Sequence, residues 1–485
     1  MIPRAHLARG GVYLVLRQIA GTGLSLVAMF FVTRTIGAAA YGSFAATLVI
    51  VTLAHSICLL GIPVFLLRQA TAPAQSDYDI AFTLTIMLGS AVTIAGLATS
   101  TVLETVTGLP GVGVVGAVMF LATLLVFAAA IPTVVIERSL DFRRIAAIEL
   151  ASQVANVAVS LPLAYFGARV WAPVAGWWAG LCAGTLLAFV FGSYRPRLRW
   201  LARRASEMLA FGIRFSASAW VFQLRQLFNP LLVGPFLGAE AVGVYALTAR
   251  IIEALTFVKA IAWRMSLAAF GQMGGSNERI AAIAARGGRL QLLIILPLLL
   301  GFSLVGPRLV TLVLGRDWGA TLALFPPLAM TAILGSAFTL QASALHVAGR
   351  SPRVAMYTAV QVVLLMSAGW GTIPFFGMTG IVLAEIAAFG AYPLLHRAMV
   401  DVYGPSRMTL TYVLGATGSI ALYWNSIGLV AWLPLACVLL VLPAPAPPDV
   451  VARWQLDIAR HRALRVLDKA PDVATLHVQQ DRGEQ

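Results

Sequence analysis

The sequence has 485 residues, of which 60% are hydrophobic and only 11% are charged, against about 25% charged residues in soluble domains. Its formal net charge is +15, but the basic residues are spread over short loops between apolar runs and form no single patch. This distribution argues against a nucleic-acid-binding protein and indicates an integral membrane protein.

Apolar runs of about 20 residues recur along the whole chain, and each is long enough to cross the hydrocarbon core of a membrane as a helix. We expect an all-α protein with about fourteen spans, at about residues 12–33, 43–66, 80–103, 112–136, 145–166, 171–192, 209–233, 241–263, 290–306, 319–345, 354–375, 378–399, 408–424 and 427–443. The stretch from Pro307 to Gly315 is either an interfacial segment or an extension of the ninth helix.

The distribution of Arg and Lys predicts the orientation of these spans. Of the 34 basic residues, 25 fall on the side of the N-terminus, and five lie within spans. Only Arg34, Arg169, Arg308 and Arg316 fall on the opposite side. Because cytoplasmic loops carry the excess of basic residues, both termini are expected in the cytoplasm, with the protein in the bacterial inner membrane.

Two short patterns repeat at similar intervals. The segment Ile36–Ala45, which contains Gly37 and Gly42, resembles Leu237–Ala246, which contains Gly238 and Gly243, 201 residues later. Phe142–Ala146 is echoed by Ser351–Ala355, and the apolar runs that follow end at Gly167 and Gly377. We therefore predict two six-helix lobes in the same orientation, related by an axis along the membrane normal, and followed by two further helices.

This repeat implies a division of the chain into four parts. The N-lobe covers residues 1–205, the C-lobe covers 206–400, and the last two spans occupy 401–448. Residues 449–485 form a basic cytoplasmic tail, which either lies on the anionic membrane surface as an interfacial helix or serves only as a solubilising segment.

The charged residues within spans are the candidates for function, because a charge near the bilayer centre costs at least about 2.5 kcal/mol on insertion scales. They gather in the first, seventh and eighth spans, where the two lobes would meet around a cavity. These residues are Arg17, Arg214, Arg225, Arg250, Glu253 and Lys259. Their excess of positive charge suits an anionic group, with phosphate as the leading candidate because Arg binds it in a bidentate manner.

Each of these residues also has a structural interpretation. Arg214 and Lys259 lie near span ends, where their side chains can reach the interface without a ligand. Arg250 and Glu253 are spaced to pair with each other. Arg17 and Arg225 have no acidic neighbour at helical spacing, which favours a role in the cavity.

Two further acids lie within the predicted spans, Glu149 and Glu385. Glu253 and Glu385 are candidate cavity acids or carriers of a coupling proton. Glu149 is a further candidate carrier, with satisfaction at the helix end as its favoured structural interpretation. The sequence has no Walker-type loop and no His or Cys spacing that suits a metal, and Cys58, Cys182 and Cys437 are scattered through apolar runs. We expect neither a cofactor, a metal site nor an enzymatic activity.

The segment Arg34-Thr35-Ile36-Gly37, followed by Tyr41-Gly42 and Phe44-Ala45, resembles the opening of bacterial polysaccharide-biosynthesis flippases of the O-antigen and exopolysaccharide type. Gly238 through Tyr245-Ala246 resembles it again. These flippases belong to the multidrug/oligosaccharidyl-lipid/polysaccharide exporter superfamily, and the pattern of spans in two lobes covers nearly the whole chain.

The resemblance implies that the chain moves an undecaprenyl-diphosphate-linked oligosaccharide from the cytoplasmic to the periplasmic leaflet by alternating access of two lobes. It would serve the synthesis of a surface polysaccharide such as O-antigen, lipopolysaccharide or exopolysaccharide. Arg17, Arg225 and Arg250, with Arg214, would contact the diphosphate. Membrane lipids, a H⁺ or Na⁺ gradient and the polysaccharide polymerase machinery are the other expected partners.

Two other functions remain open at this stage. One is an ion-coupled exporter of small molecules or drugs from the same superfamily, although a cavity for cationic drugs would more often be acidic. The other is a membrane glycosyltransferase or polysaccharide polymerase, which would normally carry a long periplasmic loop with catalytic residues. The non-cytoplasmic loops predicted here are short.

Overall fold

The computed structural model describes residues 4–69, 73–272, 277–405 and 408–441. Residues 1–432 form one unit and residues 433–485 a second, of which the helix α19 (Leu433–Val441) is described. The predicted basic tail at 449–485 therefore lies outside the described residues. All regular secondary structure in the described ranges is helical, as the composition predicts.

The first half of the chain runs from α1 to α9. Its helices are α1 (Arg4–Cys58), α2 (Ile62–Leu67), α3 (Gln75–Ala98), α4 (Ser100–Thr107), α5 (Val112–Leu121), α6 (Thr123–Arg138), α7 (Phe142–Tyr165), α8 (Trp171–Gly192) and α9 (Ala202–Leu224). A 3₁₀ turn, η1 (Arg225–Leu227), and a π-helical segment, η2 (Asn229–Val233), lead into the second half.

The second half of the first unit runs from α10 to η5. Its elements are α10 (Gly234–Leu255), α11 (Val258–Gln272), α12 (Asn277–Val313), η3 (Arg316–Trp318), α13 (Gly319–Val347), α14 (Ser351–Phe376), α15 (Met378–Ala387), η4 (Ala388–Ala391), α16 (Tyr392–Tyr403), α17 (Thr409–Ala421), α18 (Trp424–Ile427) and η5 (Leu429–Trp432). The stretch from Pro307 to Gly315 thus mostly extends the ninth predicted helix, since α12 continues to Val313.

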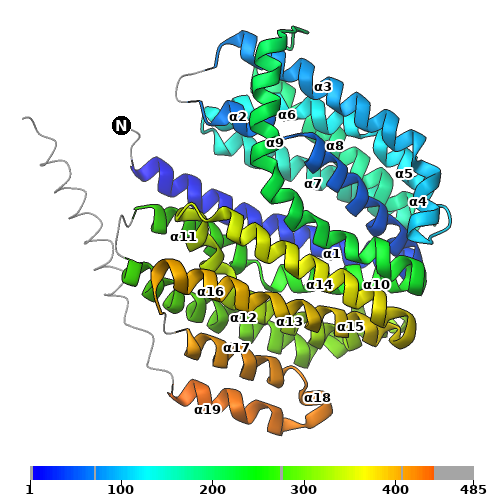
Figure 1. The fold of residues 1–485 in the computed structure, drawn as a ribbon. Helices are drawn as coiled ribbons and strands as arrows, with labels where there is room; N and C mark the ends of the chain where they lie inside the picture. Colours follow the sequence, from blue (N-terminus) through cyan, green and yellow to red (C-terminus); the bar gives the residue numbers. More distant parts are fainter. Residues whose placement is uncertain (1–3, 70–72, 273–276, 406–407, 442–485) are drawn as a thin grey trace, which may run out of the picture. The chain divides into compact units, whose positions relative to one another are not determined.

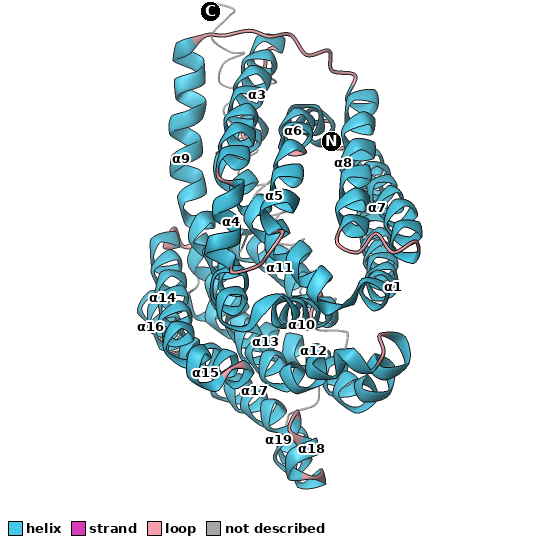
Figure 2. Ribbon diagram, turned by 90° about the vertical axis from the view of Figure 1, so that its right-hand side faces the viewer, coloured by secondary structure: helices cyan, strands magenta, loops and turns pink. Residues whose placement is uncertain are grey.

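The helices of the first unit pack in two groups (Figures 1 and 2). In the N-terminal group, α7 packs against α8 and α1, while α6 packs against α3 and α8. In the C-terminal group, α13 packs against α11, α12 and α17, and α14 packs against α15. We call these groups the N-lobe and the C-lobe.

The predicted repeat is present in the backbone. α1 is broken at Gly37 with φ 81° and ψ 169°, and α10 is broken at Gly238 with φ 81° and ψ −179°. Only glycine adopts this conformation readily, which explains why both copies of the pattern carry it. In the second pattern, α7 begins at Phe142 and α14 begins at Ser351. The sequence repeat therefore corresponds to a structural repeat.

The two copies of the first pattern also touch each other. A Cβ atom added to Gly42 would lie 1.8 Å from the carbonyl oxygen of Ala239, and one added to Gly243 would lie 2.1 Å from the carbonyl oxygen of Ala38. Because Gly42 is equivalent to Gly243 and Ala38 to Ala239, the two contacts are the same contact with the copies exchanged, and α1 and α10 meet about a local two-fold axis. Glycine at both positions lets the two backbones come into direct contact.

Further contacts between the lobes lie at the same end of these helices. Nη1 of Arg34 donates to the carbonyl oxygens of Leu312 and Val313, at 2.9 and 3.1 Å. A Cβ atom at Gly108 would meet the backbone of Pro235 at 2.8 Å. The charge distribution assigns this end to the side opposite the N-terminus. The lobes are therefore joined at the predicted periplasmic end.

The seventh predicted span differs from an ordinary helix. α9 ends at Leu224, and the chain continues through η1 and η2 with Pro230 in the π-helical segment. Proline removes a backbone donor and clashes with the preceding turn, which accounts for the irregular hydrogen bonding. The break falls at Arg225, one of the predicted site residues.

α9 contacts both lobes. Near its start, Nε of Arg204 lies 2.9 Å from Oδ1 of Asp77 in α3, and the ring of Phe211 lies 5.5 Å from that of Phe65 in α2. Past the break, the side chain of Phe228 fills the space beside Gly369 in α14. The seventh predicted span thus runs from one lobe to the other.

Ten helical segments of the described residues are long and apolar enough to span a membrane. Val27–Cys58 and Arg225–Leu255 each count once here, although each includes a glycine break. The predicted thirteenth and fourteenth spans correspond to the shorter helices α17 and α19. The number fourteen therefore stays a prediction.

We predict that Gly42→Ala lowers the thermal stability of the purified protein, because the added methyl group would overlap the Ala239 carbonyl. Overpacking of this kind typically costs about 1–3 kcal/mol. Thermal unfolding in detergent, followed by intrinsic fluorescence, measures the effect. Gly301→Ala in α12 is the matched control, since its Cβ would meet nothing within 4 Å. Equal unfolding temperatures for the two variants would contradict the predicted contact.

Candidate functional site

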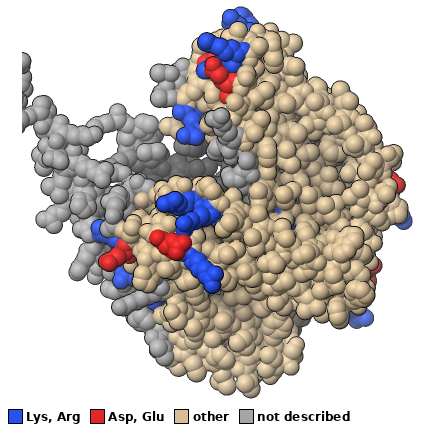
Figure 3. Space-filling view, viewed as in Figure 1, with Lys and Arg blue, Asp and Glu red and all other residues tan. Residues whose placement is uncertain are grey.

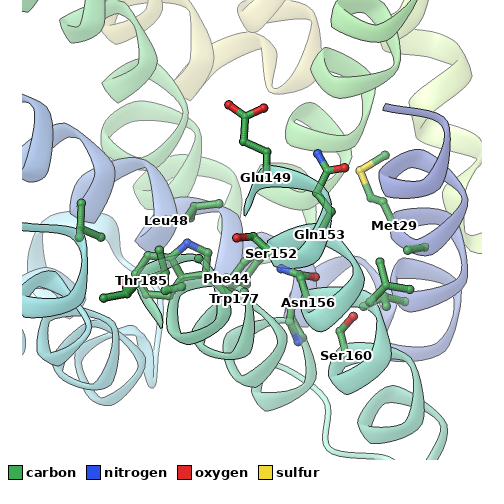
Figure 4. A pocket seen from close by; sticks show the side chains of 18 of the residues that line it. Met29, Phe44, Leu48, Glu149, Ser152, Gln153, Asn156, Ser160, Trp177 and Thr185 are labelled. Atoms are coloured by element: carbon green, nitrogen blue, oxygen red, sulfur yellow. The ribbon is translucent and has the colours of Figure 1, made fainter. Parts of the chain in front are cut away.

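The first unit contains a cavity in each lobe. The N-lobe cavity has a volume of about 620 Å³, and α1, α6, α7 and α8 supply nearly all of its wall. Figure 4 shows Glu149, Gln153, Asn156 and Ser160 following one another along α7. Arg250 of α10, a residue of the C-lobe, also lines this cavity. The N-lobe cavity therefore reaches the boundary between the lobes.

The C-lobe cavity is larger, at about 870 Å³. Its charged lining residues are Arg225, Glu253, Lys259 and Glu385. Aromatic side chains form much of the remaining wall, namely Tyr245, Trp263, Phe338, Tyr357, Phe389 and Tyr392. The cavity thus combines charged groups with flat apolar surfaces.

Arg225 is held by an ion pair that its sequence neighbours do not reveal. Its Nη2 donates to Oε2 of Glu385 at 2.6 Å, and the hydroxyl of Tyr245 donates to Oε1 of the same carboxylate at 3.1 Å. The side chain of Glu385 is only 2% exposed and that of Arg225 is 28% exposed. The pair compensates two charges that would each be costly if buried alone.

Arg250 and Glu253 form a second pair, as their spacing predicts. Nη1 of Arg250 lies 3.0 Å from Oε2 of Glu253, and the two side chains are 55% and 71% exposed. Arg250 lines the N-lobe cavity, while Glu253 lines the C-lobe cavity. One turn of α10 therefore places a positive charge in the wall of the N-lobe cavity and a negative charge in the wall of the C-lobe cavity.

The structure describes the other predicted residues only in part. Arg17 lies in α1 and Arg214 in α9, but both side chains are outside the described part of the structure. Lys259 of α11 lines the C-lobe cavity, and it makes no ion pair with another described residue. Glu149 lines the N-lobe cavity. Arg225, Lys259, Glu253 and Glu385 are thus brought together, while Arg250 faces the other cavity.

Several lining residues were not anticipated from the sequence. The tyrosines of the C-lobe cavity and the amides of α7 carry no formal charge, so a search for charged residues within spans passes over them. The available signal is a run of polar residues four positions apart in an otherwise apolar span, as at Ser152, Asn156 and Ser160. Within the described residues, no group of His, Cys, Asp and Glu could hold a metal ion.

Two lobes related by an internal repeat, each with its own cavity and joined at one end, define a multi-pass α-helical membrane protein. The chain belongs to the family described as polysaccharide biosynthesis protein, whose profile matches residues 31–323, more than half of its length. The resemblance inferred from the glycine-containing segments is thereby confirmed.

Curated relatives carry related names. The chain is 23% identical to the lipopolysaccharide biosynthesis protein WzxC of Escherichia coli K12 over 65% of its length and 64% of that of the relative. It is 25% identical to the teichuronic acid biosynthesis protein TuaB of Bacillus subtilis 168, over 36% of the chain and 40% of the relative. The matched region thus spans less than two thirds of either relative.

Solved structures share the fold at low sequence identity. The lipid II flippase MurJ in an inward closed conformation superposes with a TM-score of 0.66 at 10% identity, covering 89% of this chain and 98% of MurJ. An inward-facing multidrug resistance transporter of the MATE family and MOP superfamily gives a TM-score of 0.64 at 14% identity, covering 81% and 98%. These likenesses establish the fold.

The Arg225–Glu385 pair predicts a specific pattern of stabilities. Arg225→Ala should lower the unfolding temperature strongly, because breaking a buried pair leaves one charge uncompensated and typically costs about 3–5 kcal/mol. The double variant Arg225→Met/Glu385→Leu should recover most of this loss. Arg250→Ala, which breaks an exposed pair, should cost at most about 1 kcal/mol. The assignment would be wrong if the double variant lost the sum of the two single losses.

Proposed function

We propose that this protein translocates an undecaprenyl-diphosphate-linked oligosaccharide from the cytoplasmic to the periplasmic leaflet for the synthesis of a surface polysaccharide. Membership of the polysaccharide biosynthesis family supports this class of substrate. The observation that carries the proposal is the placement of Arg250 and Lys259 in the walls of the two cavities, at membrane depth. Lys259 makes no ion pair with a described residue, and Arg250 shares only an exposed pair with Glu253, so both are open to an anionic ligand such as a diphosphate.

The residues differ in how freely they can meet that anion. Arg225 forms a buried ion pair with Glu385, so a diphosphate would have to compete with this carboxylate to bind Arg225. Arg250 is half exposed and faces the N-lobe cavity, and Lys259 lines the C-lobe cavity. We therefore assign the main diphosphate contact to Arg250 and Lys259. Arg225, together with Arg17 and Arg214, remains a candidate for a second contact.

The arrangement of the lobes supports alternating access. The contacts between α1 and α10 and the bonds from Arg34 join the lobes at the predicted periplasmic end. Opening at that end requires these contacts to separate while the cytoplasmic ends approach. Glu385 and Glu253 are the acids available to couple this exchange to a H⁺ or Na⁺ gradient, and the released lipid-linked unit would pass to the polymerase machinery.

The proposed location is the bacterial inner membrane, with both termini in the cytoplasm. On the face seen in Figure 3, charged side chains lie mainly in the left half, the side on which α2 and α11 lie in Figure 1, and the right half is almost free of them. This asymmetry supports the orientation, because cytoplasmic loops carry the excess of Arg and Lys.

The function is tested in a strain that lacks the chain, complemented with wild type or with Arg250→Ala or Lys259→Ala. We expect each variant to reduce surface polysaccharide at least about tenfold, as loss of a charge-assisted contact to phosphate would. Lipid-linked oligosaccharide should accumulate on the cytoplasmic face. Arg353→Ala, which removes a pair with Asp401 and lines neither cavity, is the control. Normal polymer in a strain without the chain would favour the small-molecule exporter instead.

The orientation is tested by cysteine labelling in a variant without Cys58, Cys182 and Cys437. A cysteine in place of Arg316 should react with a membrane-impermeant maleimide in intact spheroplasts, because η3 is predicted to be periplasmic. A cysteine in place of Arg197, in the exposed segment between α8 and α9, should react only after permeabilisation. The reverse pattern would overturn the proposed topology.

A further inference from the structure

The wall of the N-lobe cavity contains two amide side chains whose hydrogen-bonding groups are unused. Among the described residues, neither the side chain of Gln153 nor that of Asn156 has a hydrogen-bond partner. Both lie near the middle of α7, three residues apart and therefore on neighbouring parts of one helix face. Both side chains are partly exposed, so their donor and acceptor groups are open to the cavity. The two amides are therefore available to bind a polar ligand in the cavity.

Several other polar side chains of the same wall form hydrogen bonds within the protein. Thr33 donates to the carbonyl oxygen of Met29 at 2.7 Å, and Thr133 donates to that of Ala129 at 2.7 Å. Thr185 reaches across to the carbonyl oxygen of Leu125 at 3.2 Å. These hydroxyls need no ligand, which sets the two amides of α7 apart from them.

The orientation of α7 is fixed by its packing on α8. A Cβ atom at Gly176 would lie 2.7 Å from the carbonyl oxygen of Asn156, and one at Gly180 would lie 2.8 Å from that of Ser152. Backbones this close prevent α7 from turning about its axis. Gln153 is absent from these contacts, and Figure 4 shows its amide extending away from α8, on the same side of α7 as Glu149.

The chemistry of the cavity suits uncharged sugars. Among the described residues, its charged lining residues are Glu149 and Arg250. The same wall carries the amides of Gln153 and Asn156, which can both donate to and accept from sugar hydroxyls. The indole ring of Trp177 lines the same cavity and offers an apolar surface for the C–H face of a sugar ring. An acyl chain would leave the amides unbonded, and among the described lining residues a second anion would find no cation other than Arg250.

We propose that Gln153 and Asn156, with Trp177, form a subsite that binds sugar residues of the carried lipid, next to the diphosphate contact at Arg250. This inference rests on the proposed function and deepens it. It assigns recognition of the glycan to uncharged groups of the N-lobe, apart from the cations that bind the diphosphate. Changes at these two positions should therefore alter which glycan is carried without abolishing recognition of the lipid diphosphate.

Native mass spectrometry of the purified full-length chain tests this separation with two probes. The first is undecaprenyl diphosphate without sugar. The second is the pool of undecaprenyl-diphosphate-linked oligosaccharide extracted from the strain that lacks the chain. We expect Gln153→Met and Asn156→Leu, which keep side-chain size, to weaken binding of the second probe at least about tenfold and to leave binding of the first unchanged. Lys259→Ala should weaken both.

The controls separate a binding effect from a folding effect. Ser367→Ala removes an exposed hydroxyl of α14 that bonds only to its own helix and lines neither cavity, and should change neither affinity. If the Asn156→Leu variant does not fold, the Gln153→Met variant alone tests the subsite, because Gln153 takes no part in the contacts of Gly176 and Gly180 with α7. Equal affinities of wild type and variants for both probes, or an equal loss for both, would overturn the subsite. Failure of wild type to bind either probe would overturn the proposed function itself.

Discussion

The architecture depends on the direct backbone contact between α1 and α10. Gly42 and Gly243 approach the carbonyl oxygens of Ala239 and Ala38 so closely that no larger residue fits at either position without a shift. The breaks at Gly37 and Gly238 lie five residues before these contacts, and they change the direction of each helix just before the two helices meet. Because the contact is nearly symmetric, one set of small residues, used twice, joins the two lobes at one end of the spans.

The helix α10, which joins the lobes at that end, also contributes residues to both cavities. The N-lobe cavity includes Arg250 from the other lobe, and the adjacent Glu253 faces the C-lobe cavity, so α10 connects both cavities to the contact with α1. A substrate that bridges Arg250 and the N-lobe would bind the two lobes at once. The buried Arg225–Glu385 pair plays a different part, since it neutralises charge at the break between α9 and α10 and stabilises the C-lobe.

Local patterns predicted the fold well. The repeated glycines marked the two helix breaks and the point where the lobes meet, because a positive φ and a close backbone approach both require glycine. The i, i+3 spacing likewise predicted the Arg250–Glu253 pair. Span boundaries were less accurate where the helix is irregular, as at Pro230, and where apolar helices are short, as in α17 and α19.

The site was predictable only in part, because its partners are distant in sequence. Arg225 was expected to face the cavity without a counter-ion, since its acidic partner Glu385 is 160 residues away. The aromatic wall of the C-lobe cavity and the amides of Gln153 and Asn156 carry no charge, so a search for charged residues within spans passes over them, and only the polar spacing that includes Asn156 marks α7. Helix packing decides which of them line a cavity.

The most direct test of this account is a translocation assay with the purified protein in lipid vesicles. Undecaprenyl-diphosphate-linked oligosaccharide, extracted from the strain that lacks the chain, is placed in both leaflets, and its exposure to a membrane-impermeant sugar-oxidising reagent is followed over time. The account predicts that nearly all of the lipid becomes accessible in vesicles that contain the protein, while about half stays protected in protein-free vesicles. Equal protection in both kinds of vesicle would contradict the proposed function.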